Sequence, residues 1–314
     1  MGPLRGTVTK ILGASSTVDC GPAGVFQCGL RARLSRRGGV RLAVGDRVLV
    51  TPGDVASGEA VAGAGSGTIE EVDPRRTVLR RVRDLKREYV VCANVDRIFI
   101  VVAVSDPPYN RSFIDRLIVG VERDALSPVV VVNKIDLAAG ESRALVARDM
   151  GVYGALGYAT LLVSAETGEG IDAVREAFRG RISAVVGPSG AGKSSLLNLV
   201  SPGASLAIGK VSDHDGRGRH TTTAAELVPL ADGLQGHAFV IDTPGLSEFG
   251  LGDIGPEELI AGFREIARTA VECRFKNCGH RTEPGCAVRR DVASGAIDEE
   301  RYASWLKLRE EMNA

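Results

Sequence analysis

Residues 187–194 read Gly-Pro-Ser-Gly-Ala-Gly-Lys-Ser, and they constrain the fold of this chain more than any other stretch. The apolar run at residues 182–186 predicts a buried strand before them, and residues 194–200 predict a helix after them. Backbone N–H groups in a glycine-rich turn and the positive end of the following helix together form a cradle for phosphate oxygens. The spacing G-x-x-x-x-G-K-S between a strand and a helix is that of a loop that binds a nucleoside triphosphate.

Each part of this loop has an expected role. Lys193 reaches the β- and γ-phosphates, and the Ser194 hydroxyl ligates Mg²⁺. The alternative is an ordinary glycine-rich turn between a strand and a helix, which the intact spacing disfavours. We predict that the following residues bind the nucleotide: Gly187, Pro188, Ser189, Gly190, Ala191, Gly192, Lys193, Ser194 and Ser195.

The length and composition place the chain among globular proteins of several domains. A chain of 314 residues exceeds the usual size of one core, and 44% hydrophobic with 25% charged residues is ordinary for a soluble protein. The net charge is zero, yet residues 1–90 hold 15 Lys and Arg against 9 Asp and Glu, so the N-terminal part is basic. Since no apolar run approaches about 20 residues and no signal peptide is evident, we expect a cytoplasmic protein without membrane contact.

Residues 1–73 predict a small antiparallel barrel. Short β-like runs occur at residues 5–11, 25–33, 46–50 and 68–72, with glycine and proline turn signals between them. No convincing helix interrupts these runs. We therefore predict a five-stranded barrel of the OB type.

Two basic features accompany this barrel. One is an arginine cluster that straddles one loop, and it is either a solvated face or a contact for nucleic-acid phosphates. The other is residues 74–88, with seven Lys and Arg against two acids, which we interpret as a linker at a domain boundary. The arginine cluster consists of Arg31, Arg33, Arg36, Arg37 and Arg41.

From residue 89 to residue 250 the pattern changes to alternating strands and helices. Strands are predicted at residues 98–104, 129–132, 160–163 and 237–241, and helices at residues 113–121, 142–150 and 171–178. This alternation predicts a largely parallel, doubly wound sheet, which binds ligands at the carboxyl ends of its strands.

The motif Asn133-Lys134-Ile135-Asp136 follows one of these predicted strands, and its spacing suits guanine. Asn133 can meet the O6 and N7 edge of the base, while the Asp136 carboxylate accepts from N1–H and the exocyclic amine. Adenine lacks that pair of donors, so the carboxylate would be left unpaired. After the next strand, Ser164-Ala165 offers a backbone N–H to the guanine O6.

Two segments after the phosphate loop complete the pattern expected around a γ-phosphate. Residues 216–223 read Gly-Arg-Gly-Arg-His-Thr-Thr-Thr, and one of the three threonines, which we assign as Thr223, would ligate Mg²⁺ when a γ-phosphate is present. Asp242-Thr-Pro-Gly245 ends a predicted strand. Asp242 would hold Mg²⁺, and the Gly245 N–H would contact the γ-phosphate; a simple turn is the alternative.

The C-terminal part carries a predicted metal site. Cys273, Cys278, His280 and Cys286 have the spacing C-x₄-C-x-H-x₅-C, and three thiolates with one imidazole are the ligands of a tetrahedral zinc ion. Four protein ligands leave no position for water, so this zinc is predicted to be structural. Reduced cysteines without a metal are the alternative. Helices are predicted at residues 256–271 and 299–312, with Trp305 and Leu308 as packing residues.

The order of these motifs resembles that of one known family. N-K-x-D and S-A precede the phosphate loop, the threonine segment and D-x-x-G, which is a circular permutation of the usual GTPase order. With a barrel ahead and a Cys/His cluster behind, the chain resembles the ribosome small-subunit-dependent GTPase A (RsgA) family over nearly its whole length. We expect four segments: a barrel at 1–73, a linker at 74–88, a permuted GTPase domain at 89–250 and a zinc-binding domain at 251–314.

This resemblance implies a GTPase that assists late maturation of the small ribosomal subunit, with the basic barrel on its rRNA. Leu246 stands where many GTPases have a water-orienting Gln, so the resemblance makes His220 the candidate catalytic residue, with a solvated loop histidine as the alternative. We expect a monomer that binds GTP and GDP. Two other functions stay open: a GTP-gated RNA-binding module with negligible turnover, and a GTPase that acts on DNA or another RNA.

Overall fold

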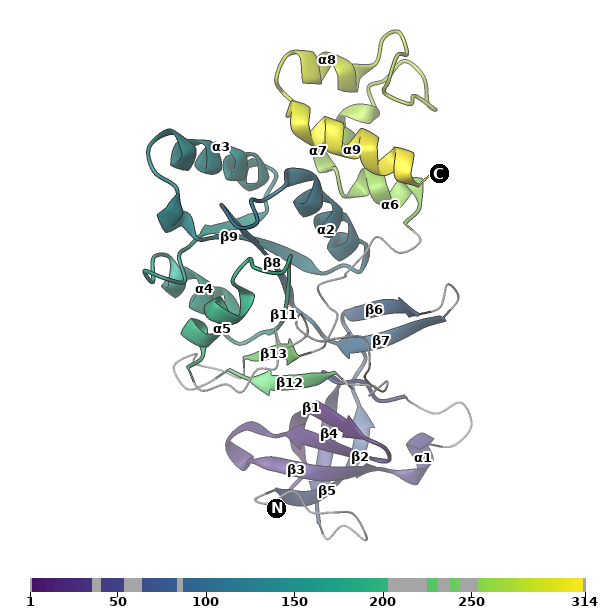
Figure 1. Ribbon diagram of the computed structural model, residues 1–314. Helices are drawn as coiled ribbons and strands as arrows, with labels where there is room; N and C mark the ends of the chain where they lie inside the picture. Colours follow the sequence, from purple (N-terminus) through teal and green to yellow (C-terminus); the bar gives the residue numbers. More distant parts are fainter. Residues whose placement is uncertain are drawn as a thin grey trace, which may run out of the picture. The chain divides into compact units, whose positions relative to one another are not determined.

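The computed structural model describes residues 2–35, 41–53, 64–83, 87–202, 225–230, 238–242 and 254–312 (Figure 1). The chain divides into two compact units. The first comprises Met1–Ile98, Ile171–Val185 and Lys193–Ser247, and the second comprises Phe99–Gly170, Val186–Gly192 and Glu248–Ala314. The four segments expected from the sequence remain a proposal.

The N-terminal strands form a closed barrel in the order β1-β2-β3-β5-β4, as predicted. β3 and β5 run parallel, whereas the other neighbouring pairs are antiparallel, and β1 closes the barrel against β4. Inward-facing side chains such as Val8, Val50 and Ile69 form the core. The strands are β1 (Leu4–Leu12), β2 (Ser15–Asp19), β3 (Val25–Leu30), β4 (Arg47–Pro52) and β5 (Gly65–Val72).

A short helix in this region corrects the sequence prediction. The expected extended run at residues 25–33 ends at Leu30, and α1 (Ala32–Ser35) follows it where no helix was expected. The Leu34 N–H donates to the Arg31 carbonyl at 2.9 Å, and the Leu34 side chain packs against the barrel core. Burial of this one side chain favours a turn over continued extension.

The basic segment at residues 74–88 contributes to a β-hairpin rather than serving only as a connection. β6 (Val78–Arg83) pairs with β7 (Arg87–Ala93) in an antiparallel two-stranded sheet. Leu79 lies opposite Cys92, and both side chains are buried. The hairpin therefore has one anchored end.

Six strands form a second sheet, in the order β10-β9-β8-β11-β13-β12. β9 pairs with β10 in parallel, and so does β11 with β13, as predicted. β12, which the sequence analysis missed, runs antiparallel to β13. The strands are β8 (Arg97–Ala103), β9 (Ser127–Asn133), β10 (Ala159–Leu162), β11 (Ile182–Val186), β12 (Glu226–Pro229) and β13 (Phe239–Asp242).

Helices connect these strands near the predicted positions. α2 begins after Asn110, whose side chain accepts a hydrogen bond from the Ser112 N–H and so caps the helix. The apolar face predicted for α2 is buried at Ile114, Leu117 and Ile118. The helices here are α2 (Arg111–Arg123), α3 (Glu141–Ala155), α4 (Ile171–Phe178) and α5 (Lys193–Val200).

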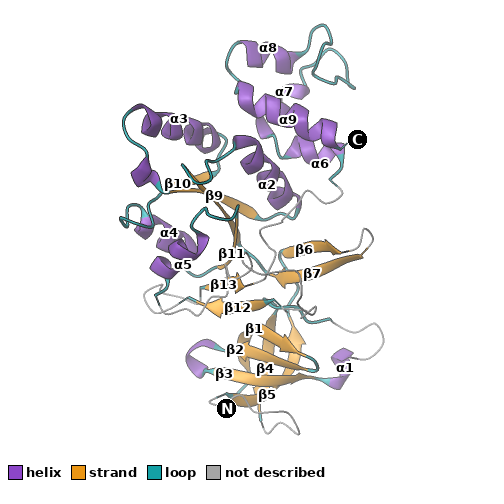
Figure 2. Cartoon of the chain, in the orientation of Figure 1, coloured by secondary structure: helices purple, strands orange, loops and turns teal. Residues whose placement is uncertain are grey.

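The C-terminal region is helical (Figure 2), with α6 (Pro256–Ala261), α7 (Arg264–Ala270), α8 (Ala287–Ala293) and α9 (Glu299–Glu311). The single helix expected at residues 256–271 is in fact two helices, α6 and α7. A Cβ at Gly262 would lie 2.6 Å from Val119 on α2, so the chain turns where its backbone closely approaches that helix. Trp305 and Leu308 are buried in the core of this region, as predicted.

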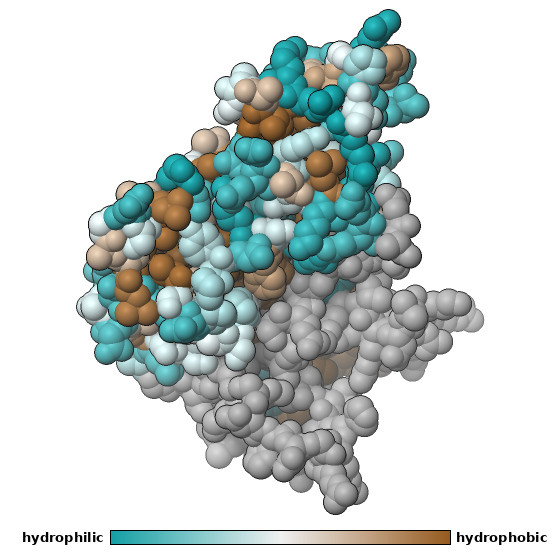
Figure 3. Space-filling model, turned by 45° about the horizontal axis from the view of Figure 1, so that its top comes forward, coloured by the Kyte–Doolittle hydropathy of each residue, from teal (hydrophilic) through white to brown (hydrophobic). Residues whose placement is uncertain are grey.

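The coloured part of the surface in Figure 3 is mixed in character. Figure 3 shows hydrophobic groups interspersed among hydrophilic ones on the face that it draws. Among the helices of the described residues, none combines the length and the apolar character needed to cross a bilayer.

Candidate nucleotide and zinc sites

The predicted phosphate loop connects the end of β11 at Val186 to the start of α5 at Lys193. Two of its glycines are required by close contacts. Gly187 has φ +147°, and a Cβ there would lie 1.9 Å from the Val101 carbonyl oxygen. Gly192 has φ +86°, and a Cβ there would lie 2.2 Å from Asn133 Nδ2. Any larger residue would displace the loop from β8 or from the N-K-I-D motif.

Asn133 joins three of the predicted motifs. Its side chain is buried at the end of β9; Nδ2 donates to the Ala191 carbonyl at 3.0 Å, and Oδ1 accepts from the Ala165 N–H at 3.0 Å. The amide therefore ties N-K-I-D to the phosphate loop and to S-A. Since the Ala165 N–H already has this partner, a guanine O6 would share that donor or take it from Asn133.

Lys134 and Asp136 occupy different environments. Lys134 has φ +61°, and its ammonium donates to the backbone oxygens of Asp106 at 2.6 Å and Ser105 at 3.2 Å. Ile135 is buried, and Asp136, in the short 3₁₀ helix Ile135–Leu137, is exposed. The Asp136 carboxylate is therefore accessible to a base.

The turn at residues 105–108 was missed by the sequence analysis. It follows β8 directly and contacts both Lys134 and the phosphate loop, since a Cβ at Gly190 would lie 3.1 Å from the Asp106 oxygen. The signal was present, because Ser-Asp-Pro-Pro is a turn sequence at the carboxyl end of a buried strand.

Ser164 shapes the S-A loop from inside. Its hydroxyl oxygen accepts from the backbone N–H groups of Glu166 at 3.2 Å and Thr167 at 3.0 Å, and its side chain is fully buried. Ser164 therefore holds the loop in position, whereas the neighbouring Ala165 N–H donates to the Asn133 side chain.

Lys193 and Ser194 lie in the first turn of α5, where a helix N-terminus favours anions. Burial lowers the pKa of the Lys193 ammonium, and a nearby phosphate would restore the preference for its charged form. β13 ends at Asp242 and runs parallel to β11, so both strands lead to the same edge of the sheet. The remaining predicted residues lie outside the described part of the chain: His220, Thr223 and Gly245, together with Thr221, Thr222 and Leu246.

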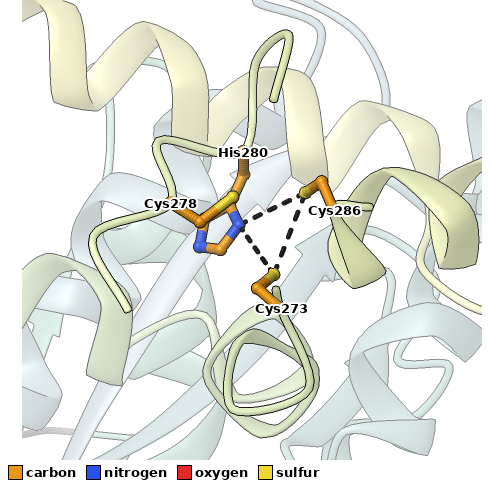
Figure 4. A group of neighbouring side chains, drawn as sticks. All are labelled: Cys273, Cys278, His280 and Cys286. Atoms are coloured by element: carbon orange, nitrogen blue, oxygen red, sulfur yellow. Dashed lines mark hydrogen bonds between the residues drawn. The ribbon is translucent and has the colours of Figure 1, made fainter. Parts of the chain in front are cut away.

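The four predicted zinc ligands converge in the C-terminal region (Figure 4). Cys273 Sγ lies 3.9 Å from Cys286 Sγ, and both sulfurs lie 3.5 Å from His280 Nδ1. All four ligand atoms, including Cys278 Sγ, lie within 4.8 Å of one another. Zinc–sulfur bonds of about 2.3 Å in a tetrahedron separate two sulfurs by about 3.8 Å, so these positions fit a structural zinc ion.

The histidine is suited to this role. Burial, and then the positive charge of Arg309, lowers the pKa of His280, which favours the neutral imidazole that binds zinc. His280 has φ +55°, and the Tyr302 hydroxyl on α9 donates to its carbonyl at 2.5 Å. The His280 ring also lies 5.5 Å from the ring of Trp305. Two side chains of α9 therefore hold His280 in position.

A carboxylate that the sequence analysis missed organises the zinc loop. Glu283 accepts hydrogen bonds from the backbone N–H groups of Gly279 at 2.7 Å, Arg281 at 2.8 Å and Thr282 at 3.0 Å. Hydrogen bonds from its own N–H and from those of Arg281 and Gly279 lower the pKa of Glu283 to about 2. The available signal was an acid within the Thr-Glu-Pro-Gly turn between two metal ligands.

Comparisons with known proteins place this chain in one family. A family model described as RsgA GTPase matches residues 72–252. The small ribosomal subunit biogenesis GTPase RsgA of Chlorobaculum parvum is 41% identical over 313 residues, which cover 97% of this chain and 97% of that protein. The protein of the same name from Moorella thermoacetica is 39% identical over 311 residues, covering 99% and 98%.

Solved structures are similar over the full chain. The crystal structure of YjeQ from Thermotoga maritima aligns with a TM-score of 0.78 and 33% identity, covering 100% of this chain and 99% of that one. The crystal structure of YloQ, described as a circularly permuted GTPase, aligns with a TM-score of 0.75 and 26% identity, covering 99% and 96%.

Proposed function

This chain belongs to the RsgA GTPase family and is a GTP-hydrolysing enzyme, and we propose that it acts on the small ribosomal subunit during late maturation. The partner is proposed because this chain's relatives are named for biogenesis of the small ribosomal subunit. Its nucleotide would be held by the phosphate loop, N-K-I-D and S-A. We further propose that it works as a monomer in the cytoplasm.

The observation that carries the nucleotide-binding part of this proposal is the position of Asn133. A buried amide that bonds Ala191 and Ala165 brings the base-binding motif and the phosphate loop together. In the sequence, these motifs are far apart and in permuted order. Their meeting at one amide supports a guanine-nucleotide site at this place.

Guanine selectivity is proposed to reside in Asp136. This exposed carboxylate can accept two hydrogen bonds from N1–H and the exocyclic amine of guanine. Adenine lacks N1–H, and its amine lies elsewhere on the ring. The aliphatic stem of Lys134, which lies between the base motif and the turn at Ser105 and Asp106, would cover one face of the base.

The proposed reaction is attack of water on the γ-phosphate of GTP. Lys193, at the start of α5, would stabilise charge on the transferring group, and a Mg²⁺ ion held by Ser194, Thr223 and Asp242 would neutralise more of it. Gly245 would contact the γ-phosphate. Because leucine at position 246 cannot orient water, His220 is the proposed catalytic residue, and slow turnover without a partner is expected.

The basic barrel is the proposed rRNA contact. Arg31 lies 3.0 Å and Arg33 lies 3.8 Å from carboxylate oxygens of Glu70, so these two charges are partly neutralised within the barrel. Arg36 and Arg37 lie outside the described residues. If the arginine cluster contacts rRNA phosphates, reversing these charges will reduce the salt dependence of subunit binding and leave GTP affinity unchanged.

Phosphate release from GTP, measured with and without purified small ribosomal subunits, tests the proposal. We expect small subunits to stimulate release, and large subunits to leave it near the basal rate. Lys193→Ala provides the inactive control. Tight GTP binding with no release in the presence of small subunits would instead indicate a GTP-gated binding module, and stimulation by DNA or another RNA alone would indicate a different target.

A further inference from the structure

A buried ion pair joins the C-terminal region to α2. The Arg301 side chain on α9 is fully buried, and Nη1 donates to Asp115 Oδ1 on α2 at 2.7 Å. Nε donates to Glu265 on α7 at 2.9 Å, and the Tyr153 hydroxyl donates to the same Asp115 oxygen at 2.8 Å. The Phe263 ring lies 4.5 Å from the guanidinium carbon. One arginine therefore connects α9, α7 and α2.

The ion pairs of Arg301 occupy a buried position that apolar side chains could fill with similar stability. Burial opposes the charge on Arg301, but the charges of Asp115 and Glu265 outweigh it and raise the pKa of Arg301. Buried ion pairs are often replaceable by hydrophobic residues without loss of stability, and in some proteins their role is to fix a particular geometry. Arg301 contacts α2 through Asp115, so the geometry that it would fix is the position of α2 relative to α9.

A second arginine holds the first turn of α2. Arg111 is buried, and Nη2 donates to Asp298 Oδ1 at 2.6 Å while Nη1 donates to Glu300 Oε2 at 3.0 Å. Asp298 is also the N-cap of α9, and the same Oδ1 accepts from the Arg301 N–H at 2.9 Å. The starts of α2 and α9 therefore share one carboxylate.

The first turn of α2 directly follows the turn that contacts the nucleotide motifs. The backbone oxygens of Ser105 and Asp106 hold the Lys134 ammonium, and Asp106 lies against Gly190 of the phosphate loop. The Tyr109 hydroxyl, just before the N-cap, donates to Asp149 at 2.8 Å. Only four residues separate Asp106 from Arg111. A shift of α2 would therefore move the backbone oxygens of Ser105 and Asp106 that hold the Lys134 ammonium.

We propose that Arg301 is a positioning residue for the guanine nucleotide, acting through α2 and the turn at residues 105–108. This inference rests on the proposed function in that residues 133–136 and the phosphate loop must bind the nucleotide. The contacts through Arg301, Asp115 and α2 connect the C-terminal region to the nucleotide site without involving residues 243–253. By linkage, a nucleotide that fixes Lys134 also stabilises α2 against α9.

The test uses the full-length, zinc-loaded protein and the fluorescent probe mant-GDP. Arg301→Met keeps most of the side-chain volume but leaves Asp115 without its cation. We expect it to raise the Kd for mant-GDP by about fivefold or more, in the range of ordinary couplings between sites. Arg301→Met/Asp115→Leu/Glu265→Gln removes the arginine and both carboxylates that pair with it. This triple variant should regain stability without regaining full nucleotide affinity, because the uncharged side chains do not enforce the same geometry.

Two controls separate positioning from general stability. Val288→Ala, in the core on α8, lowers stability at a helix that packs on α7, and it should leave the Kd within twofold of wild type. Arg290→Met removes an exposed ion pair with Glu272, and it should change neither the stability nor the Kd for mant-GDP. A Kd that follows the melting temperature equally in all variants would overturn the proposal.

Hydrogen exchange of the wild-type protein tests the proposal without depending on the folding of any variant. Saturating GDP should slow amide exchange in residues 298–305 of the wild type, and this protection should be lost in Arg301→Met if that variant folds. Unchanged exchange in the wild type at saturating GDP would overturn the inference. Failure of the wild type to bind mant-GDP at all would instead count against the proposed function.

Discussion

The Asn133 side-chain amide donates to the Ala191 carbonyl at 3.0 Å, while Gly192 leaves no room for a Cβ beside the same nitrogen. Residues 58 positions apart in the chain thus form one contact between base motif and phosphate loop. The contact is made inside the protein, so part of the base site is already in place before any nucleotide binds.

Asn133→Ala removes this contact and leaves the Ala191 carbonyl and the Ala165 N–H without their partner. An unsatisfied buried group costs about 1–3 kcal/mol, so we expect the Kd for GDP to rise about 10- to 100-fold in a mant-GDP titration. Asn198→Ala, at an exposed position on α5, is the matched control and should bind as the wild type does. Wild-type affinity in Asn133→Ala would show that the bridge is dispensable.

Asp136→Asn should convert the base preference. An amide cannot accept from both guanine donors, but it can donate to the C2 carbonyl of xanthine. Two charge-assisted hydrogen bonds are affected, so we expect GDP affinity to fall about 100-fold and XDP affinity to rise. Competition titrations with GDP, XDP and ADP measure this. The assignment fails if the wild-type protein binds ATP as tightly as GTP.

Removal of zinc should loosen the C-terminal region first. Metal analysis of protein purified without chelators should find about one zinc per chain. Chelation should then raise hydrogen exchange in α8 and α9 before nucleotide binding is lost, because the ligands hold the loops around a core that includes Val288 and Leu308. Cys278→Ser should lose the metal, while Cys20→Ser, in the barrel, should retain it. A metal content near zero in wild-type protein contradicts this site.

Glu283→Ala should weaken zinc binding although Glu283 is no ligand. Loss of the carboxylate frees the N–H groups of Gly279, Arg281 and Thr282, and residues that orient ligands typically change metal affinity about 10- to 100-fold. Competition with a chromogenic zinc chelator measures this change, and Glu283→Gln should show a smaller effect because its amide oxygen still accepts.

The same carboxylate has a defined pH dependence. The pKa of Glu283 is lowered from 4.5 to about 2, so its stabilising contribution is complete above about pH 4.5 and is lost as the pH falls through about 2. The Glu283→Ala defect should therefore be constant between pH 6 and pH 8. A defect that changes strongly within that range would point to another group.

His220→Ala should separate binding from catalysis. His220 lies outside the described residues, so its role stays a prediction from the sequence. If the imidazole positions the attacking water, the variant will keep GTP and subunit binding but lose about 100-fold or more of the subunit-stimulated rate. Stopped-flow phosphate release at saturating GTP tests this, and full stimulated turnover in the variant would exclude the role.

Local sequence patterns determined much of this protein. The phosphate loop, N-K-I-D, S-A and the Cys/His cluster depend on residue types at short spacings, and strands such as β8 and β9 depend on continuous apolar runs. These signals lie within a few neighbouring residues, so they can be seen without the fold. The barrel could also be predicted, because its strands are short and separated by turn signals.

Only the tertiary structure decided how distant groups meet. α1 forms because the Leu34 side chain packs against the barrel core. α6 ends before α7 because the backbone at Gly262 closely approaches Val119. The bridging role of Asn133 and the burial of Arg301 against Asp115 depend on partners 58 and 186 residues away. No local pattern distinguishes Arg301 from a surface arginine on α9, because its buried position results from helices packing around it.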